Sequence, residues 1–426
     1  MLDIKFIREN SEKVKKACQD KNIQLNIDEI LALDTKRRSL IVSSENLKAK
    51  QRKLGKDNID EARKIKEEFL QAAKTLQETE IQLHQLLVQV PNIPLADVPV
   101  GKTEAENQVI KMVGKKPIFD FTPKNHWELA QGLDLIDKER ATKVTGARFA
   151  YLKGDLVKLQ WALMHFGVEV LSSEKTLAKI ARAAKLQVST KPFVPVLPPL
   201  MIKTGPYDAM DRLEPREERY KIEGEDLWLQ GSAEHVLGTM HMQETFEEAE
   251  LPVRYVGYAT SFRKEAGTYG KDTEGIIRMH QFDKLEMESL TTAENSLDEH
   301  YFMVAIQEYL MTQLGLPYQV VLKCTADIGK PNARGIDIDV WLPGQDKYRE
   351  THTADYMTDY QARRLQTKVK RKTGTTELVH TNDATAFSQR PLIAILENYQ
   401  QKDGSVKVPK VLQKYTGFKI IKNGRK

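Results

Sequence analysis

The spacing of apolar positions near the amino terminus predicts two long helices joined by a turn. Between residues 28 and 90 the chain has no proline and one glycine, which lies in the turn-like cluster Gly55-Lys-Asp-Asn58. Apolar residues recur every seven positions before the turn and every three or four after it. These stripes are Leu33, Leu40, Leu47 and Leu54, then Ala62, Ile65, Phe69, Ala72, Leu76, Thr79, Leu83, Leu86 and Val90. They predict an antiparallel hairpin whose helices are each about 40 to 45 Å long.

Beyond the hairpin the pattern changes to one typical of a mixed domain. Residues 91–125 begin with Pro91-Asn-Ile-Pro94, which predicts the end of the second helix and a crossing segment. Helices are predicted near 127–137 and 153–171. Strand-like runs follow at 193–197, 227–229, 255–262, 279–288, 318–322, 336–341 and 347–353. Few of these runs are separated by a regular crossover helix, which favours an antiparallel sheet.

Composition mainly excludes classes of protein. The 426 residues are 40% hydrophobic and 29% charged, which is typical of two or three globular domains. No stretch approaches the roughly 18 to 20 apolar residues that cross a bilayer, so no membrane contact is expected. Only Cys18 and Cys324 occur, which favours a reducing compartment such as the cytoplasm. The net charge of +5 weakly favours a polyanionic partner.

The predicted hairpin carries a basic cluster near its turn. A two-helix hairpin of this length buries little, so we expect its surface to be its functional part. The basic residues there are Lys48, Lys50, Arg52, Lys53 and Lys56. Two interpretations remain open at this point, an ordinary solvated helix face and a surface that binds phosphate groups.

The densest chemical signal lies in residues 260–286. Two strand-like ends flank a loop with glycines, and alternation places Arg263 with Glu265 on one strand and Phe282 with Lys284 and Glu286 on the other. Charged groups that converge on one sheet face are costly unless they are paired or solvated. A polyphosphate substrate would pair them, and cross-strand salt bridges on a wet face are the alternative. No glycine-loop nucleotide motif is present, so a nucleotide would bind on the sheet face.

As a whole, this block resembles motif 2 of class II aminoacyl-tRNA synthetases in the form found in the seryl-tRNA synthetase family. It contains Phe262-Arg-Lys-Glu-Ala-Gly267, Gly270-Lys-Asp-Thr-Glu-Gly275 and Arg278-Met-His-Gln-Phe-Asp-Lys-Leu-Glu286. The resemblance extends to the hairpin, to Val196-Leu-Pro-Pro199 as motif 1, and to residues 396–401 after motif 3. It implies an α+β fold, with an antiparallel-sheet catalytic domain flanked by helices over residues 106–426 and an antiparallel coiled-coil arm over residues 1–105.

The resemblance also implies residues for ATP. Arg263 would hold the α-phosphate, where a planar cation can stabilise charge that develops on phosphorus. The full implied set is Arg263, Arg278 and Arg390 as catalytic residues at the phosphates, with Glu265, Met279, Phe282 and Glu350 completing the nucleotide site. Phe282 would stack on the adenine ring.

For serine and Mg²⁺ the resemblance implies further residues. The serine set is Ser232, Glu234, Arg263, Glu286 and Thr385, and the Mg²⁺ pair is Glu350 and Thr353. Glu286 would accept a hydrogen bond from the serine hydroxyl, and alanine would leave that carboxyl group unpaired. Oxygen ligands suit a hard cation.

Several positions depart from the family pattern. Ser232 and Thr353 stand where threonine and serine are usual, so each keeps a hydroxyl group. Asp383 stands where asparagine is common. The motif 3 segment from Thr385 to Arg390 is one residue short of the common bacterial spacing, and Pro391 follows it.

The implied activity is the formation of seryl-adenylate from serine and ATP, followed by transfer of serine to tRNA(Ser), with tRNA(Sec) open as a second acceptor. The implied assembly is a homodimer through motif 1, with tRNA bound by Lys50, Arg52, Lys53 and Lys56 of the arm. Two alternatives are a paralogue that activates an amino acid for another acceptor and a non-catalytic regulator or scaffold. The arm argues against the first, and retention of Arg263, Glu286 and Glu350 argues against the second.

Overall fold

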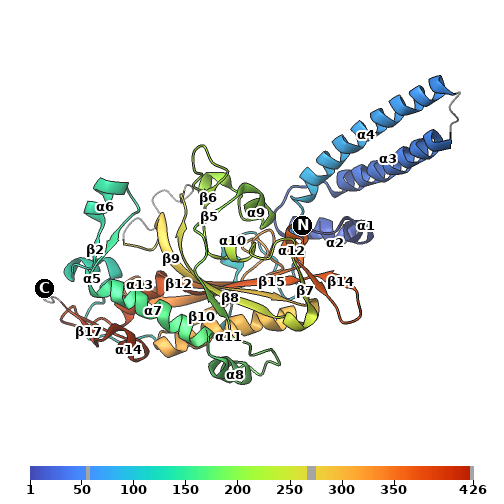
Figure 1. The fold of residues 1–426 in the computed structure, drawn as a ribbon. Coiled ribbons are helices and arrows are strands. Elements are labelled where there is room, and N and C mark those ends of the chain that lie inside the picture. Colours follow the sequence, from blue (N-terminus) through green and yellow to red (C-terminus); the bar gives the residue numbers. More distant parts are fainter. Residues whose placement is uncertain (54–57, 266–274, 423–426) are drawn as a thin grey trace.

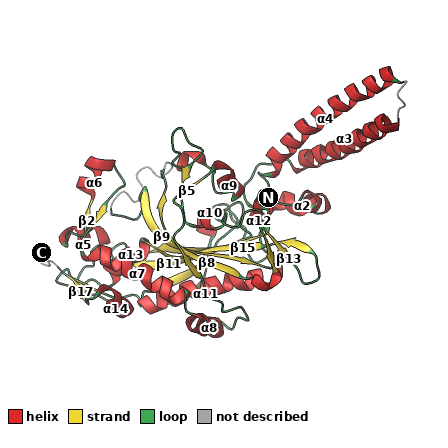
Figure 2. Cartoon of the chain, viewed as in Figure 1, coloured by secondary structure: helices red, strands yellow, loops and turns green. Residues whose placement is uncertain are grey.

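An eight-stranded β-sheet forms the centre of the molecule in the computed structural model, which describes residues 1–53, 58–265 and 275–422 (Figures 1 and 2). Its strands lie in the order β1 (Gln108–Val113), β10 (Tyr318–Leu322), β11 (Arg334–Leu342), β12 (Lys347–Thr358), β15 (His380–Ser388), β9 (Gln281–Thr291), β8 (Val253–Phe262) and β4 (Val194–Val196). All neighbours pair antiparallel except β4 and β8, which are parallel. The expected α+β fold is confirmed.

Helices and short strands surround this sheet. The helices are α1 (Ile4–Glu9), α2 (Ser11–Asp20), α3 (Ile27–Lys53), α4 (Ile59–Leu87), α5 (His126–Gly132), α6 (Lys138–Thr145), α7 (Asp155–Leu171), α8 (Glu174–Ala183), α9 (Thr204–Ala209), α10 (Glu234–Leu237), α11 (Ser296–Leu314), α12 (Tyr360–Leu365), α13 (Arg390–Asn398) and α14 (Gln413–Thr416). The short strands are β2 (Ile136–Asp137), β3 (Tyr151–Leu152), β5 (Met201–Ile202), β6 (Trp228–Leu229), β7 (Thr245–Glu247), β13 (Lys368–Lys370), β14 (Thr376–Leu378), β16 (Val406–Lys407) and β17 (Ile420–Ile421). Within the described ranges, no helix is both long and apolar enough to cross a membrane.

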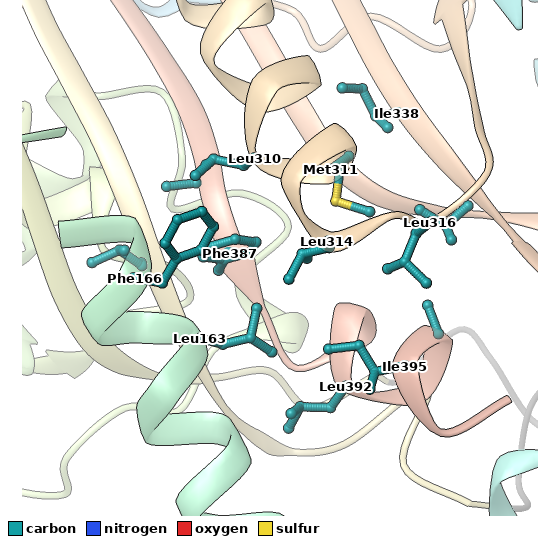
Figure 3. Packing of buried hydrophobic residues seen from close by; sticks show 14 of the residues in the cluster. Leu163, Phe166, Leu310, Met311, Leu314, Leu316, Ile338, Phe387, Leu392 and Ile395 are labelled. Atoms are coloured by element: carbon teal, nitrogen blue, oxygen red, sulfur yellow. The ribbon is translucent and has the colours of Figure 1, made fainter. Parts of the chain in front are cut away.

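Helices α7, α11 and α13 pack against one face of the sheet and form the main hydrophobic core with it (Figure 3). Leu163 and Phe166 of α7, Leu310 of α11 and Leu392 of α13 are buried there together with Phe387 of β15. Because successive side chains of a strand point to opposite faces, the other face of the same strands is left for polar residues.

A close approach of α7 to the sheet depends on Gly167. A Cβ atom at this position would lie 2.6 Å from a methyl carbon of Leu285 in β9 and 3.0 Å from the ring of Phe387 in β15. Real Cβ atoms do not come this close to other carbon atoms, so only glycine lets the helix lie at this distance from the two central strands.

The amino-terminal hairpin projects from the rest of the molecule as α3 and α4 (Figure 1). The predicted stripes face the partner helix, since Ile65, Thr79 and Leu83 are buried and Leu33 and Leu40 are partly buried. Leu54 and most of the predicted turn, residues 54–57, lie outside the described residues. Helices α1 and α2 and Tyr360 of α12 pack at the base of the hairpin.

A buried carboxylate lies within the base of the arm. Asp34 of α3 is fully buried, and its oxygens lie 2.8 Å from a nitrogen of Arg8, 3.3 Å from Arg37 and 3.1 Å from Arg38. A buried charge is tolerated only with such partners, so these ion pairs tie α1 to the first turns of the arm.

All seven predicted strand runs fall on observed strands, and both predicted helices beyond the hairpin are observed. The helix expected near 127–137 ends earlier, as α5 at Gly132, and is followed by the short strand β2. Two large elements were not predicted, the 19-residue helix α11 and the central strand β15.

Candidate functional site

A cavity of about 290 Å³ lies on the sheet face opposite the covering helices. Its floor comes from strands β9, β12 and β15, where alternation places residues two apart on the same face. The register brings these strands' polar residues together, because Glu286 pairs with Thr385, and Asp383 pairs with both Glu288 and Asp355. Most side chains that line the cavity are polar or charged. Many of them form ion pairs with one another, and a cavity lined by charged groups of both signs suits a charged ligand, so this cavity is the candidate site.

Three arginines predicted from the sequence line one end of this cavity. Arg263 donates a hydrogen bond of 2.9 Å from Nε to the carbonyl oxygen of Gly231, and its guanidinium group lies 5.3 Å from the centre of the Phe282 ring. Arg278 donates to the Glu265 carboxylate at 3.0 Å. Met279 also lines the cavity. The structure therefore brings together the residues that the sequence implied for a nucleotide.

The third arginine, Arg390, begins α13 and meets Glu350 of β12. Its Nη1 atom lies 3.0 Å from the Glu350 carboxylate and 2.8 Å from the Glu350 carbonyl oxygen. Burial alone would raise the pKa of Glu350, but the charges of Arg390 and Lys323 outweigh burial and lower this pKa to about 2. Glu350 is therefore an anion at neutral pH.

Thr353 lies three residues beyond Glu350 and also lines the cavity. Its hydroxyl group donates a hydrogen bond to Asp337 of β11. Burial and the charge of Glu350 raise the pKa of Asp337 to about 8, against the opposing effect of Lys323, whose ammonium group lies 3.6 Å away. Among the described residues no group of three or more His, Cys, Asp or Glu side chains could hold a metal alone. The oxygen atoms of Glu350 and Thr353 do fit a cation that takes its other ligands from phosphates.

Lys284 organises the part of the site formed by Ser232, Glu234 and Glu286. Its Nζ atom donates to the Ser232 hydroxyl at 3.0 Å and lies 2.8 Å from Glu286 and 3.7 Å from Glu234. Glu234 and Thr385 line the cavity, whereas Glu286 is fully buried beneath Lys284 and does not. All the residues implied for serine are thus close together, with a lysine between the cavity and Glu286.

The two carboxyl groups beside Lys284 differ in pKa. Burial raises the pKa of Glu286 well above its usual value, although Lys284 opposes this. Burial would also raise the pKa of Glu234, but the charges of Lys284, His235 and Arg212 outweigh it and hold this pKa well below the usual range. Two neighbouring carboxyl groups therefore have different protonation, one ionised and one that retains its proton to higher pH.

The structure adds Arg212, Lys323 and Asp355 to the predicted cavity residues. Arg212 lies 3.2 Å from the Asp383 carboxylate and 3.6 Å from that of Asp355. Alternation along the strand could have identified Asp355, which is two residues from Thr353. Arg212 follows α9 in a loop, and no local pattern in the sequence marks it.

Three residues predicted to bind tRNA are not among those that line the cavity, and other predicted residues lie outside the described part of the chain. Lys50, Arg52 and Lys53 are exposed in the last turn of α3, at the end of the arm away from the central sheet (Figure 1). Lys56 lies outside the described residues, as does the part of the motif 2 block at 266–274.

Comparisons with known proteins cover the whole chain. Residues 1–94 match the family model of the seryl-tRNA synthetase N-terminal domain, and residues 218–399 match that of the tRNA synthetase class II core domain (G, H, P, S and T). The chain is 39% identical to the serine–tRNA ligase of Thermodesulfovibrio yellowstonii, over 99% of this chain and 100% of that protein. It is 36% identical to the serine–tRNA ligase of Nitrosopumilus maritimus, over 98% of this chain and 99% of that protein.

Two solved structures are also similar over their full lengths. Seryl-tRNA synthetase from Pyrococcus horikoshii, complexed with ATP, superposes with a TM-score of 0.90 at 36% identity and covers 100% of both chains. Cytoplasmic serine–tRNA ligase from Naegleria fowleri, in complex with AMP, superposes with a TM-score of 0.87 at 30% identity, and the match covers 100% of this chain and 99% of the other.

Proposed function

Because the chain belongs to the seryl-tRNA synthetase family and is an ATP-dependent serine–tRNA ligase, we propose that serine and ATP react in the cavity on the sheet face. The observation that carries this assignment is one cavity in which three arginines adjoin a pocket rich in carboxyl groups. The arginines suit a polyphosphate, and the carboxyl groups suit an amino acid's ammonium group. The two alternatives, a ligase for another acceptor and a scaffold, are not favoured by relatives that match over the whole chain.

In the first step, a carboxylate oxygen of serine attacks the α-phosphorus of ATP, and pyrophosphate leaves. Arg263 neutralises charge at the α-phosphate and the serine carboxylate, while Arg278 and Arg390 hold the β- and γ-phosphates. Phe282 and Glu265 receive the adenine, with Met279 beside them. The substrate carboxylate is already the nucleophile, so the protein mainly positions and neutralises the reactants.

In the serine pocket, Glu234 supplies the negative charge for the ammonium group, and its lowered pKa keeps it ionised at neutral pH. Thr385 faces the hydroxyl group directly. This group would displace the Lys284 ammonium from Glu286 and Ser232, which Lys284 contacts and which do not line the cavity. In the second step, a ribose hydroxyl at the 3′ end of tRNA attacks the seryl carbonyl carbon, and AMP leaves. We propose tRNA(Ser) as the acceptor. Charging of tRNA(Sec) would show whether it is a second one.

Glu350 and Thr353 would hold Mg²⁺ together with phosphate oxygens of ATP. When bound, the cation would neutralise phosphate charge beside Arg390. Asp337, which accepts the hydrogen bond from Thr353, would keep the hydroxyl oxygen turned toward the cavity.

The proposed function is tested by exchange of labelled pyrophosphate into ATP with serine, alanine, threonine or cysteine, followed by charging of total tRNA. Serine alone should support rapid exchange, and excess EDTA should stop it. Exchange without charging would favour the ligase for another acceptor, and absence of both would favour the scaffold.

We further propose that the arm, within residues 1–105, binds tRNA. The last turn of α3, which carries the basic residues, lies at the end of the arm away from the central sheet (Figure 1), and a substrate the size of tRNA can contact both this turn and the cavity on the sheet. Lys50, Arg52 and Lys53 are exposed in this turn and suit a phosphate backbone. Charged tRNA is consumed by ribosomes, so the cytoplasm is the proposed place of action.

Replacing Lys50, Arg52 and Lys53 by glutamine should raise the KM for tRNA about tenfold or more, because fewer neutralised phosphates release fewer counterions on binding. The slope of log KM for tRNA against log salt concentration should fall by about two. The rate of serine-dependent pyrophosphate exchange should not change. The matched control replaces Lys175, Lys179 and Arg182 of α8, which are also exposed. Equal effects of both triple variants on charging would contradict recognition by the arm.

A homodimer through motif 1 is proposed from the edge strand β4. Val194 is 53% exposed, Leu197 81% and Met201 45%, and an apolar sheet edge is usually covered by a partner. Replacing Val194 and Leu197 by aspartate should raise the dimer dissociation constant at least about a hundredfold in sedimentation experiments. The control is Ile118→Asp, at a residue that is 99% exposed elsewhere. A double variant that stays dimeric down to the same protein concentration as the wild-type protein would overturn the proposed interface.

A further inference from the structure

The segment 329–333 lies between the base of the arm and the catalytic cavity. Gly329 and Asn332 line the cavity. On the other side, the main chain of the same segment faces Lys21, which follows α2 and is only 7% exposed. The Lys21 ammonium group donates to three carbonyl oxygens, those of Gly329 at 3.0 Å, Lys330 at 3.1 Å and Asn332 at 2.6 Å. One side chain from the amino-terminal part thus holds three peptide groups of a cavity wall.

The contact is reciprocal, because the segment also holds the end of the arm. Lys330 donates from Nζ to the carbonyl oxygen of Val88, just after α4, at 2.9 Å and pairs with Asp211 at 2.8 Å. Asn92 donates from Nδ2 to the carbonyl oxygens of Pro331 at 2.9 Å and Met357 at 2.7 Å. The segment is therefore fixed to both ends of the arm and to β12.

Holding the Lys21 ammonium away from water is costly. Burial lowers its pKa to about 7, although the charges of Asp355 and Asp211 offset part of this effect. An ammonium group has three N–H donors, and the three carbonyl oxygens use all of them. A methionine side chain of similar length would fill the same space without donating to any of the three.

On the cavity side, Asn332 is 1% exposed, and its side-chain oxygen has no hydrogen-bond partner among the described residues. A Cβ atom added at Gly329 would lie 3.5 Å from both the Asn332 amide nitrogen and the Arg212 guanidinium group. Arg212 in turn pairs with Asp383. Asn332 and Arg212 therefore border the same glycine in a cavity that Asp383 also lines, and a buried acceptor without a donor favours a ligand that brings one.

We propose that Asn332 is a further serine-binding residue and that Lys21, in the amino-terminal part, is a positioning residue that holds it in place. Serine brings hydroxyl and ammonium donors to this part of the cavity, whereas ATP is held at the arginine end. The tRNA-binding part of the chain thereby sets the affinity for the amino acid. This inference rests on the proposed serine pocket.

The test compares Lys21→Met and Asn332→Ala in serine-dependent pyrophosphate exchange. Each variant should raise the KM for serine about tenfold, while the KM for ATP stays within about twofold. The double variant should show no more than about the larger single effect, because both changes act on one contact. Lys16→Met is the matched control, since Lys16 is exposed on α2 and forms its ion pair locally, with Asp20.

Two further controls distinguish the positioning role of Lys21 from an effect on the stability of the fold. Lys21→Arg keeps donors and charge and should restore most of the serine affinity, and thermal midpoints identify variants that have lost the fold. If Lys21→Met does not fold, Asn332→Ala decides the proposal. An unchanged KM for serine in a folded Lys21→Met or Asn332→Ala variant, or single effects that multiply in the double variant, would overturn it. Wild-type protein that shows no serine-dependent exchange would instead refute the proposed function itself.

Discussion

Replacement of Arg263 by alanine should lower serine-dependent pyrophosphate exchange at least about a thousandfold and leave tRNA affinity within about twofold. The guanidinium group lines the cavity, with Nε on the carbonyl oxygen of Gly231 and the Phe282 ring beside it, and this is where we propose that the α-phosphate and the serine carboxylate meet. Removal of one preorganised donor from a charged transition state costs about 10² to 10³ in rate, and a full positive charge costs more.

The measurement is steady-state exchange with serine and ATP each varied, together with filter binding of tRNA. Arg263→Lys keeps the charge but loses the planar fork, so its rate should lie between wild type and alanine. Arg216→Ala is the matched control, because Arg216 is exposed and pairs with Glu214 outside the cavity. Exchange at the wild-type rate in Arg263→Ala would refute the phosphate role.

Replacement of Glu286 by alanine should lower kcat/KM for serine about a hundredfold and leave the KM for ATP nearly unchanged. A site built to hydrogen-bond a hydroxyl group loses its preference when that partner is removed, so discrimination between serine and alanine should fall as well. Lys284 keeps Glu234 and Ser232 as partners in this variant, which limits disruption of the pocket.

Glu286→Gln distinguishes the protonation state of this residue. Burial raises the pKa of Glu286 well above its usual value, so this carboxyl group keeps its proton to higher pH than an ordinary glutamate. The glutamine amide resembles that acid form, and the loss of activity in Glu286→Gln should be only a few-fold. Because Glu286 accepts from the serine hydroxyl group and an ionised carboxylate is the stronger acceptor, serine affinity should strengthen as the pH rises through this pKa. An equal loss for glutamine and alanine would show that the ionised form is required, and wild-type activity in Glu286→Ala would remove Glu286 from the serine pocket.

The hairpin and most strands could be predicted because one face of each is apolar. The helix α11 was missed because polar residues such as Glu299, His300 and Gln307 are buried within it, which disrupts the helical stripe. The strand β15 was missed because it carries Asp383 on its cavity face and Asn382 on the face toward α11, and both residue types are typical of loops in a sequence. Buried ion-paired and hydrogen-bonded side chains thus hid α11, and the polar cavity face contributed to hiding β15.

The residues of the candidate site also divide into those that the sequence predicts and those that only the folded chain brings together. The ATP and serine residues follow from motifs that lie in short segments of sequence. Arg212 and Lys323 come from separate loops, and only the folded sheet brings them to Asp383 and Asp337. The arrangement of Glu286 beneath Lys284 also depends on tertiary packing, since alternation predicts only that both lie on one face.

The absence of a side chain at Gly167 has a consequence for substrate selection. The strands that Gly167 allows α7 to approach carry Leu285 and Phe387 underneath, and Glu286 and Thr385 of the same strands belong to the proposed serine pocket above. A methyl group added beneath this floor would push both strands upward and narrow the pocket from below. Amino-acid preference in this enzyme can therefore drift through changes in the hydrophobic interior, at positions that no substrate ever touches.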